Sequence, residues 1–550
     1  MENRRFILIG ILGALLFFIY QAWQKDYPAA APVPATAAAP AADVPKAAAT
    51  ETSAAAATPA DAQAADTGER IRVETDLFIA EIAARGGELR RLQLKDYAAV
   101  KDQPARMALL DDEAGRLFVL QSGLAGPQAP LSSPDTVYSS AQSSYQLSQG
   151  NDQLEVLLTH QNADGVLIRK TYVFKRGSYQ IDLAQSVQNA SAAPLSLSPY
   201  VRLLRTAYQQ GGEPRFAHTF TGVGFYQQAE AGSAKYKFKK TALDKLDKEK
   251  VEQAQTGGWI SILQHYFVAA IIPPADEAVT YSARPRSSAP GYIAQYVGNA
   301  VSVAPGAEQR FATRLYIGPK LQDHVAEVAP GFELTLDYGL LSFIAKYMFL
   351  VLKFFHGLTA NWGVAIILLT LVVKLALYKL SEAQYRSMAR MKVFSPKIQE
   401  IRERYADDRE RQQKAMMDLY KKEGFNPLAG CWPILVQFPV FISLYWVLLE
   451  SVELRQAPFA LWLQDLSAPD PFYVLPVLYG ITMFLQQRLS GNQTMDPTQQ
   501  RVMQIMPIAL TAFFAFFQSG LVLYWVVNGL ISIAQQWYIM RKLDREGAKK

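Results

Sequence analysis

Five long apolar segments in the second half of the chain constrain its fold most strongly. An α-helix rises 1.5 Å per residue, so about 20 mostly apolar residues are enough to cross the hydrocarbon layer of a bilayer. The five segments are residues 362–380, 428–449, 472–487, 502–517 and 521–539. Together they predict a polytopic α-helical membrane protein.

A sixth apolar segment opens the chain. Arg4 and Arg5 precede fourteen uninterrupted apolar residues, 6–19, and Tyr20 and Trp23 follow them. A cleaved signal peptide is one interpretation, because its apolar core has 7–15 residues. We favour a retained anchor, since the two aromatic residues suit the membrane boundary and no small-x-small cleavage site follows directly. Either way the arginines stay inside and the following segment is exported.

The chain after this anchor, which covers residues 1–27, changes composition twice. Residues 28–68 are almost all Ala, Pro, Thr, Ser and Asp, and such a segment cannot bury enough apolar area to fold. They predict a disordered linker. Residues 69–325 then have the period-two alternation and turn signals of an antiparallel β-sandwich, with helical periodicity only in the charged stretch 235–255. The candidate strands are residues 71–75, 153–158, 166–174, 179–183, 259–272 and 310–317.

Composition argues against several functional classes. Cys431 is the only cysteine, so an intramolecular disulfide or a cysteine metal cluster is ruled out. His160, His218, His265 and His324 are scattered singly in the exported domain, and no phosphate-loop motif occurs. The net charge of +6 suits basic residues that orient a membrane protein. We therefore expect no enzymatic activity, no catalytic residues, no cofactor or metal, and no nucleic-acid substrate.

Residues 333–357 predict an amphipathic helix in the membrane surface. Lys346 and Lys353 are seven residues apart and fall on nearly the same helical face. A true span is the alternative. It would place the charged stretch 381–424, which holds eleven Lys or Arg, outside the cell and against the positive-inside rule. With six spans, both chain ends, including the basic tail 541–550, are cytoplasmic.

The charged stretch 381–424 predicts a cytoplasmic helical hairpin. We expect helices at 381–405 and 408–422, and Ser395 before Pro396 is the arrangement typical of a helix start. A solvated loop that only orients the protein is the alternative. The amphipathic spacing favours a contact surface for something arriving from the cytoplasm, and its candidate contact residues are Arg390, Lys392, Lys397, Arg402 and Arg404.

Lys374 is the one ionisable residue well inside a predicted span. It lies twelve residues after Trp362, or about 18 Å along a helix, and about 7.5 Å before Lys379 at the inner end. Its side chain could therefore snorkel to the headgroups. The alternative is that it faces a water-filled cavity among the helices. Neutral polar residues on the other spans favour that cavity, and no span contains a carboxylate.

Several motifs carry a resemblance to the YidC/Oxa/Alb insertase family, specifically its Gram-negative bacterial branch. In the helical half they are Asn-Trp-Gly at 361–363, Asn-Pro-Leu-Ala-Gly-Cys-Trp-Pro at 426–433, Gln-Phe-Pro at 437–439, residues 452–462 and 465–467, and Ser-Gly-Leu-Val-Leu-Tyr-Trp at 519–525. In the exported domain, Gly-Trp-Ile at 258–260 and residues 264–267 and 316–320 also fit. The resemblance implies a five-helix core over 361–540 that encloses a hydrophilic groove, and an exported super-sandwich.

The resemblance also implies site residues. The family's groove charge, usually arginine, falls on Lys374, and a proline usual shortly after it is Lys379 here. The loss of the planar guanidinium puts any bidentate role in doubt. The candidate groove residues are Lys374, Thr370, Gln437, Gln487, Trp525, Asn528 and Gln535, and the candidate apolar contacts for an incoming helix are Phe438, Met483 and Phe484.

The implied function is insertion and folding of membrane proteins in the bacterial inner membrane, without nucleotide hydrolysis. The implied partners are nascent membrane proteins, the Sec translocon, the ribosome with the signal-recognition targeting machinery, and membrane lipids. Two alternatives stay open. One is a channel or solute transporter that uses the same groove. The other is an envelope scaffold or sugar-binding module in which the sandwich does the work.

Overall fold

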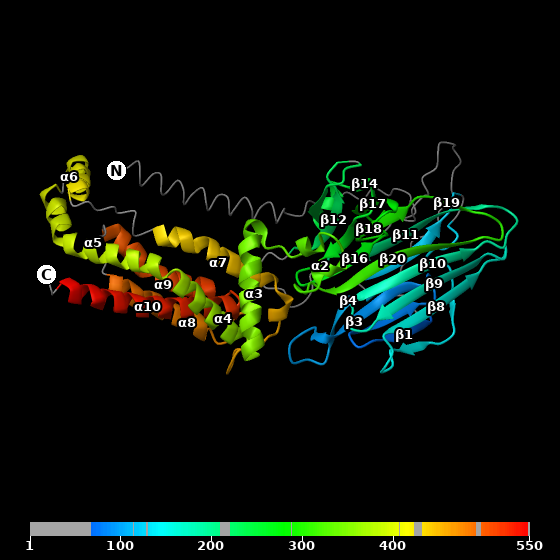
Figure 1. Cartoon of the computed structure of the whole chain (residues 1–550), viewed down its shortest axis with the longest axis horizontal. Coiled ribbons are helices and arrows are strands. Elements are labelled where there is room, and N and C mark those ends of the chain that lie inside the picture. The colour runs from blue at the N-terminus through cyan, green and yellow to red at the C-terminus, as the bar shows by residue number, and fades with distance from the viewer. Residues whose placement is uncertain are drawn as a thin grey trace.

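The computed structural model describes residues 68–113, 115–127, 130–208, 220–230, 232–287, 289–405, 408–422, 432–490 and 497–547. The predicted anchor 1–27 and all of the predicted linker 28–68 except Gly68 lie outside these residues. Figure 1 shows two halves, a β-sandwich and a bundle of helices, with helix α3 standing across the boundary between them.

The sandwich consists of two antiparallel-rich sheets, as the alternation predicts. The larger sheet has the strand order β14-β17-β18-β11-β5-β3-β2-β1-β7, with β4 paired to β3 and β19 paired to β11. Its strands are β1 (Arg70–Glu74), β2 (Phe78–Ala83), β3 (Glu88–Ala98), β4 (Arg106–Leu110), β5 (Phe118–Ala125), β7 (Ser144–Gln146), β11 (Leu195–Arg205), β14 (Val251–Thr256), β17 (Ala278–Pro285), β18 (Tyr292–Gly298) and β19 (Val301–Val303).

The smaller sheet has the order β13-β12-β15-β16-β20-β10-β9-β8-β6. Its strands are β6 (Ser139–Ser140), β8 (Gln153–Gln161), β9 (Leu167–Lys175), β10 (Gln180–Gln188), β12 (Gly222–Gln228), β13 (Tyr236–Ala242), β15 (Trp259–Leu263), β16 (Phe267–Ile272) and β20 (Glu308–Pro319). The predicted hairpin around Gly177 is β9–β10, and the last predicted strand is β20. Alternate residues of β9, such as Ile168, Tyr172 and Phe174, enter the core between the sheets.

Two predictions within the sandwich are wrong. Residues 259–272 are not one strand but the hairpin β15–β16. The hairpin is closed where the backbone N–H of Gln264 donates to the Phe267 carbonyl at 2.9 Å. Both strands are buried along their whole length, so no alternation marks the turn. The stretch 235–255 is not helical except for the short 3₁₀ turn η1 (Leu243–Asp247), and forms β13 and β14. These strands end their sheets, and the lysines of β13 protect its exposed edge.

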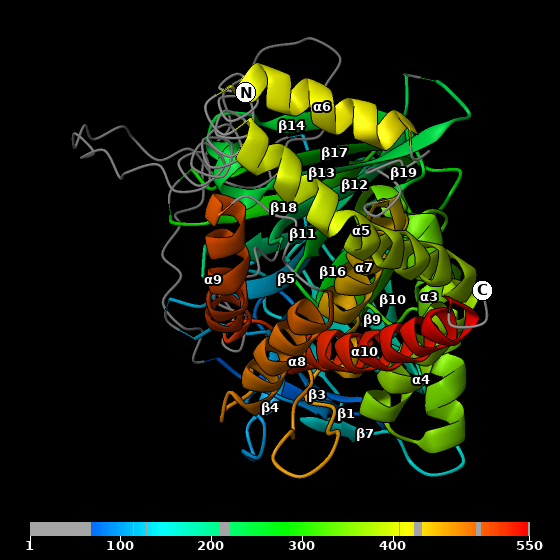
Figure 2. The same ribbon diagram turned by 90° about the vertical axis from the view of Figure 1, so that its left-hand side faces the viewer.

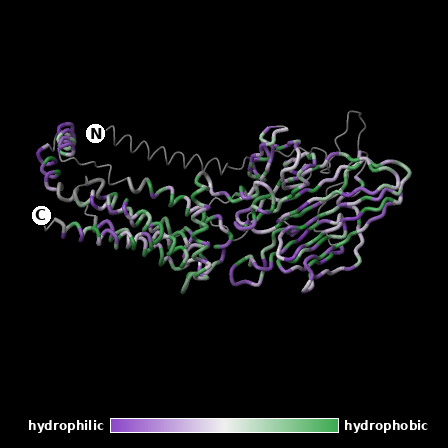
Figure 3. The backbone as a smooth tube through the Cα atoms, in the orientation of Figure 1, coloured by the Kyte–Doolittle hydropathy of each residue, from purple (hydrophilic) through white to green (hydrophobic). Residues whose placement is uncertain are grey.

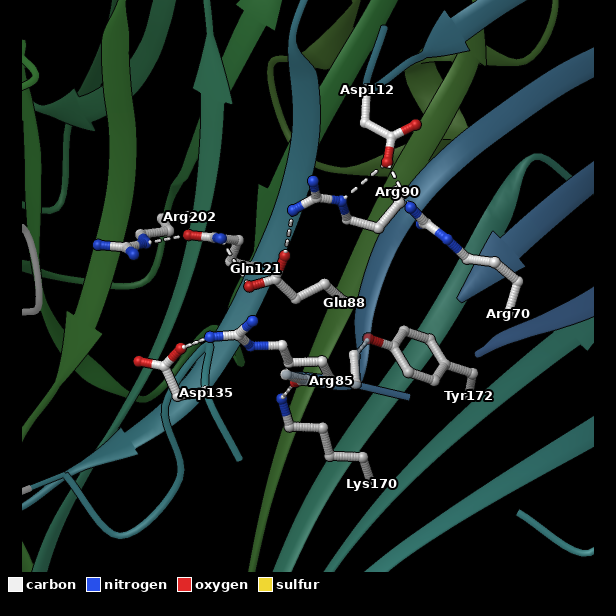
Figure 4. Close-up of polar contacts among 12 residues, drawn as sticks. Arg70, Arg85, Glu88, Arg90, Asp112, Gln121, Asp135, Lys170, Tyr172 and Arg202 are labelled. Atoms are coloured by element: carbon white, nitrogen blue, oxygen red, sulfur yellow. Dashed lines mark hydrogen bonds and ion pairs between the residues drawn. The ribbon is translucent and has the colours of Figure 1, made fainter. Parts of the chain in front are cut away.

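A polar network is buried inside the sandwich (Figure 4). The Lys170 ammonium donates to the carbonyls of Gly86 at 2.6 Å and Ser122 at 2.7 Å, and joins the two sheets. Tyr172 donates to the Gly87 carbonyl at 2.7 Å. Nearby, Arg90 pairs with Glu88 at 2.9 Å. Burial lowers the pKa of Lys170 to about 7, and the Glu88 carboxylate opposes that shift.

The helical half begins with short turns after β20 and continues in longer helices. The short elements after β20 are α2 (Val325–Val328), η2 (Phe332–Thr335) and η3 (Gly339–Leu341), and a further one, η5 (Val452–Leu454), lies among the long helices. The long helices are α3 (Ser342–Thr359), α4 (Trp362–Ala376), α5 (Tyr378–Arg404), α6 (Arg409–Lys422), α7 (Trp432–Glu450), α8 (Val474–Ser490), α9 (Pro497–Phe514) and α10 (Ser519–Gly547). Figure 2 views this half end-on, and α10 packs against both α4 and α8.

Hydropathy changes along the helical half, from apolar near α3 to polar at the far end (Figure 3). Apolar residues colour the helices near α3, and polar residues colour α6 at the far end. No single helix of the described residues is both long and apolar enough to cross a bilayer alone. One pair, residues 362–376 and 378–389, meets that test together and is bent by 65°. The six spans therefore stay a prediction.

Two predicted helix starts differ from the structure. The helix predicted over 333–357 begins only at Ser342, because Thr335, Leu336 and Tyr338 are buried in an irregular segment beside the sandwich. Pro396 does not start a helix, since α5 runs through it. A proline inside a helix removes one backbone hydrogen bond. That loss is tolerated here, because α5 continues past Pro396 and Ile398, two residues later, is buried by packing.

Candidate groove among the helices

A cavity of about 280 Å³ opens among α4, α5, α7, α8 and α10. One wall is polar and comes mainly from α5 and α10, and the other is apolar and comes mainly from α7. The lining residues are Lys374, Leu377, Leu380, Ser381, Gln384, Tyr385, Gln437, Phe438, Phe441, Gln486, Tyr524, Trp525, Asn528 and Ser532. None of these side chains is acidic.

Lys374 reaches this cavity from the last turn of α4. Its side chain is 5% exposed, and its ammonium donates to the Ser532 hydroxyl of α10 at 2.7 Å. That hydroxyl in turn donates to the Asn528 carbonyl at 2.7 Å. The Tyr385 hydroxyl of α5 donates to the Ser532 carbonyl at 3.2 Å. Ser532 is thus the point where α4, α5 and α10 meet.

The charge of Lys374 is held without a carboxylate in the cavity lining. The residue lies two positions before Ala376, where α4 ends. Unpaired carbonyls concentrate at the end of a helix, and their dipoles favour a nearby cation. The 65° bend after Ala376 keeps α5 from continuing along that axis. The site therefore offers a positive charge supported by dipoles and open to a guest.

Gln437 and Asn528 form a second polar pair across the cavity. The Gln437 amide of α7 donates to the Asn528 side-chain oxygen of α10 at 3.0 Å. Phe438, beside it, is 58% exposed at the mouth. Trp525 packs on Phe441 with ring centroids 4.7 Å apart. An amide pair beside one exposed and two half-buried aromatic rings suits a guest that carries both polar and apolar groups.

The structure brings five of the predicted groove and contact residues to the cavity, namely Lys374, Gln437, Phe438, Trp525 and Asn528. The others do not line it. Thr370 is buried and donates to the Ile366 carbonyl of its own helix at 2.7 Å. Met483 and Phe484 lie on α8, and the exposed Phe484 ring lies 4.8 Å from the Arg488 guanidinium. Gln487 and Gln535 are half-buried.

Sequence reasoning missed Ser532 and Tyr385. Gln486 was among the neutral polar residues on the spans that favour a cavity, but not among the candidate groove residues. A signal for Ser532 was present, because it lies four residues after Asn528 and so on the same helical face. Tyr385 had a weaker signal. Tyr385 belongs to a charged stretch, and its approach to α10 depends on the bend between α4 and α5.

The candidate contact residues of the charged stretch lie on α5. Arg404 pairs with Glu400 at 2.6 Å, and Lys397 is exposed while Arg402 is half-buried. The side chains of Arg390 and Lys392 lie outside the described part. Helix α6 folds back on α5, where Gln412 donates to the Arg402 carbonyl at 3.3 Å. Within the described residues, no group of three or more His, Cys, Asp or Glu could hold a metal ion.

Comparison with known proteins connects this architecture to a family. Residues 70–351 match the family model described as YidC periplasmic domain, and residues 354–546 match the model described as 60Kd inner membrane protein. A protein of Methylococcus capsulatus named membrane protein insertase YidC is 44% identical over 554 residues, with both chains fully covered. The chain belongs to the YidC family of membrane protein insertases.

Other YidC relatives agree. The membrane protein insertase YidC of Nitrosococcus oceani is 42% identical over 555 residues, again with both chains fully covered. A solved structure described as an active YidC insertase with its first transmembrane domain resolved is 18% identical, covers 86% of this chain and 93% of its own, and has a TM-score of 0.39. By the two family models, the sandwich is the periplasmic domain of this YidC-family chain, and the helical half is its inner-membrane part.

Proposed function

We propose that this chain inserts membrane proteins into the inner membrane through the cavity between α4, α5, α7, α8 and α10. One observation carries the proposal. A buried lysine points into an open, partly polar cavity whose lining contains no carboxylate. A proton-coupled transporter normally uses acidic groups inside the membrane, so this lining supports insertion over the channel or transporter alternative.

The physical argument rests on the cost of polar groups in hydrocarbon. A charged side chain at the bilayer centre costs about 2.5–3.5 kcal/mol even on the mildest scale. A cavity with Gln437, Asn528 and Ser532 replaces lipid by polar groups and water over part of the path. Lys374 attracts an acidic tail into it. The remaining apolar barrier is then thinner than the intact bilayer.

The driving force comes from the client. Its apolar helix leaves the cavity past the exposed ring of Phe438, and Met483 and Phe484 on α8 offer further apolar contacts. Burial of that helix in lipid releases about 25 cal/mol per Å² of apolar surface. No nucleotide is required.

The membrane arrangement follows from the same proposal. The chain crosses the inner membrane six times, both ends are cytoplasmic, and the apolar face of α3 lies in the outer surface of the membrane. The α5–α6 hairpin then extends into the cytoplasm, where its basic residues meet the ribosome and the signal-recognition machinery. The chain works alone or with the Sec translocon.

Reconstitution tests the proposal. Liposomes that contain the purified protein should insert a single-span client with an acidic tail. Lys374→Met should lower the initial rate about tenfold, equivalent to roughly 1.4 kcal/mol, and Lys374→Arg should retain most of it. Lys379→Met removes an exposed lysine five residues away and serves as the matched control.

Insertion that is undiminished in Lys374→Met would remove the lysine from the mechanism. Flux of small solutes across sealed liposomes, without client insertion, would instead support the channel or transporter alternative. Complete loss of insertion on deletion of residues 70–320, rather than a reduction of a few fold, with the helical half still folded, would favour a function centred on the sandwich.

A further inference from the structure

Helix α7 is the cavity wall with the least support from its neighbours in the bundle. It supplies Gln437, Phe438 and Phe441 to the cavity. Within the described residues, however, it packs mainly against α3, and only lightly against the turn η3, α5 and α10. Its position relative to α10 must therefore be set largely from outside the bundle.

The outer end of α7 enters a polar socket on the sandwich. The Lys320 ammonium lies 3.3 Å from the Glu450 carboxylate, and His265 donates from Nε2 to the Leu449 carbonyl at 2.9 Å. Both sandwich side chains are 3% exposed. Leu449 and Glu450 are the last two residues of α7, so the socket holds the very end of the helix.

The chemistry of the socket makes it rigid. Removal of one partner of a buried ion pair leaves an uncompensated charge, so such pairs resist separation. His265 is kept neutral, because burial and the nearby Lys320 charge lower its pKa to about 3. A neutral imidazole keeps one N–H for the Leu449 carbonyl. His265 lies in the turn between β15 and β16, and Lys320 directly follows β20.

The segment after α7 is held by the same domain. Gln322 donates from its amide side chain to the Ser451 hydroxyl at 2.7 Å, and its backbone N–H donates to Glu453 at 3.1 Å. On the other side, the Arg455 guanidinium donates to the Ala98 carbonyl at the end of β3 at 2.8 Å. Contacts on two sides of the segment prevent rotation about a single point.

We infer that the sandwich is a clamp that positions α7, and that Lys320 and His265 are positioning residues which hold Gln437 and Phe438 at the cavity through Glu450 and Leu449. The expected effect on insertion rests on the proposed function, whereas the expected position of α7 relative to α10 does not. In the clamped state Gln437 stays within hydrogen-bond distance of Asn528, and the cavity keeps its width.

A cross-linking experiment measures the position of α7 directly. Gln437→Cys and Asn528→Cys are combined in a Cys431→Ser background of the full-length chain, and the rate of oxidative disulfide formation is recorded in liposomes. Lys320→Met should lower that rate at least threefold and lower client insertion in the parent chain by a similar factor. Glu450→Gln, a milder change at the same pair, should act in the same direction.

Two further variants separate positioning from general damage. The apolar double variant Lys320→Met with Glu450→Leu removes both charges, and should recover most of the cross-linking rate. Lys353→Met breaks an exposed pair with Asp323, 2.6 Å apart and close to the socket, and should change neither measurement. Thermal unfolding checks that each variant is folded.

The outcomes distinguish the inference from the proposed function. Unchanged cross-linking in Lys320→Met and Glu450→Gln, while Lys374→Met still lowers the insertion rate about tenfold, overturns the clamp and leaves the proposed function intact. A response of cross-linking to Lys320→Met in a chain that inserts no client supports the clamp and overturns the proposed function. Equal loss in Lys320→Met and Lys353→Met also overturns the clamp.

Discussion

The sandwich and the helical half each contain a buried lysine, and they accommodate it in opposite ways. Lys170 is fully enclosed, with two backbone carbonyls as acceptors and the Tyr138 ring 5.1 Å away. Lys374 has one acceptor among the described residues, the Ser532 hydroxyl, and lies beside an open cavity. An ammonium has three donors, so Lys374 keeps capacity for water or a guest.

The difference separates a lysine that holds a fold together from one that is available for binding. Removal of the enclosed Lys170 amine would leave both of its carbonyl acceptors without a donor. A partly satisfied amine at a cavity can be removed at low cost to the fold. The same substitution should therefore mainly lower stability at Lys170 and mainly lower client insertion at Lys374.

The largest expected effect is on the stability of the sandwich. Lys170→Met leaves the carbonyls of Gly86 and Ser122 without their donor inside the core. Each buried unsatisfied group costs about 1–3 kcal/mol, so the free energy of unfolding should fall by about 2–4 kcal/mol. Urea unfolding of the full-length protein, followed by amide exchange in β5 and β9, measures it. A loss below about 0.5 kcal/mol would contradict the role assigned to Lys170.

The next effect is a dependence of that stability on pH. Burial lowers the pKa of Lys170 from its ordinary value of 10.5 to about 7. Between these values the unfolded chain binds a proton that the folded chain does not, so the unfolding free energy should rise from pH 7 toward pH 9.5. Lys170→Met should flatten this rise. A wild-type profile that stays flat over this range, with no difference from Lys170→Met, would show that the amine stays charged in the folded state.

A smaller stability effect is expected at the cavity. Lys374→Met removes one hydrogen bond to Ser532, and should lower the unfolding free energy of the helical half by about 1 kcal/mol or less. Thermal unfolding in detergent and client insertion are measured on the same preparation. A destabilisation as large as that of Lys170→Met would erase the contrast between the two lysines.

The smallest effect provides the baseline. Lys353 is about half exposed, and its pair with Asp323 is open to solvent. Lys353→Met should change the unfolding free energy by about 0.5 kcal/mol or less, since exposed pairs contribute little. Increasing salt should leave the difference between wild type and variant near zero.

Much of this architecture could be predicted from local pattern. Alternation identified β1, β8, β9, β10 and β20, and Lys374 was conspicuous as a charge in an apolar segment. The hairpin β15–β16 could not be recognised, because both strands are buried on both faces and the turn at His265 carries no glycine or proline. The start of α3 was set by packing of Leu336 and Tyr338 beside the sandwich.

The polar residues of the cavity wall were harder to predict than the cavity lysine, Lys374. Ser532 is a small residue in an apolar helix, and it gains its role only because α4 and α10 pack together. The socket around Glu450 joins β15–β16, β20 and α7, which are far apart in sequence. No periodicity within one segment reports such a contact.

The break between α4 and α5 also fixes a rotational phase. Successive residues of a helix are turned by about 100° around its axis. One residue added beside Leu377 would turn the whole of α5 by that angle, and would carry Tyr385 away from Ser532 while α4 and Lys374 stayed in place. Length at this joint is therefore more restricted than residue type, and single-residue insertions there should be tolerated far less than substitutions of Leu377.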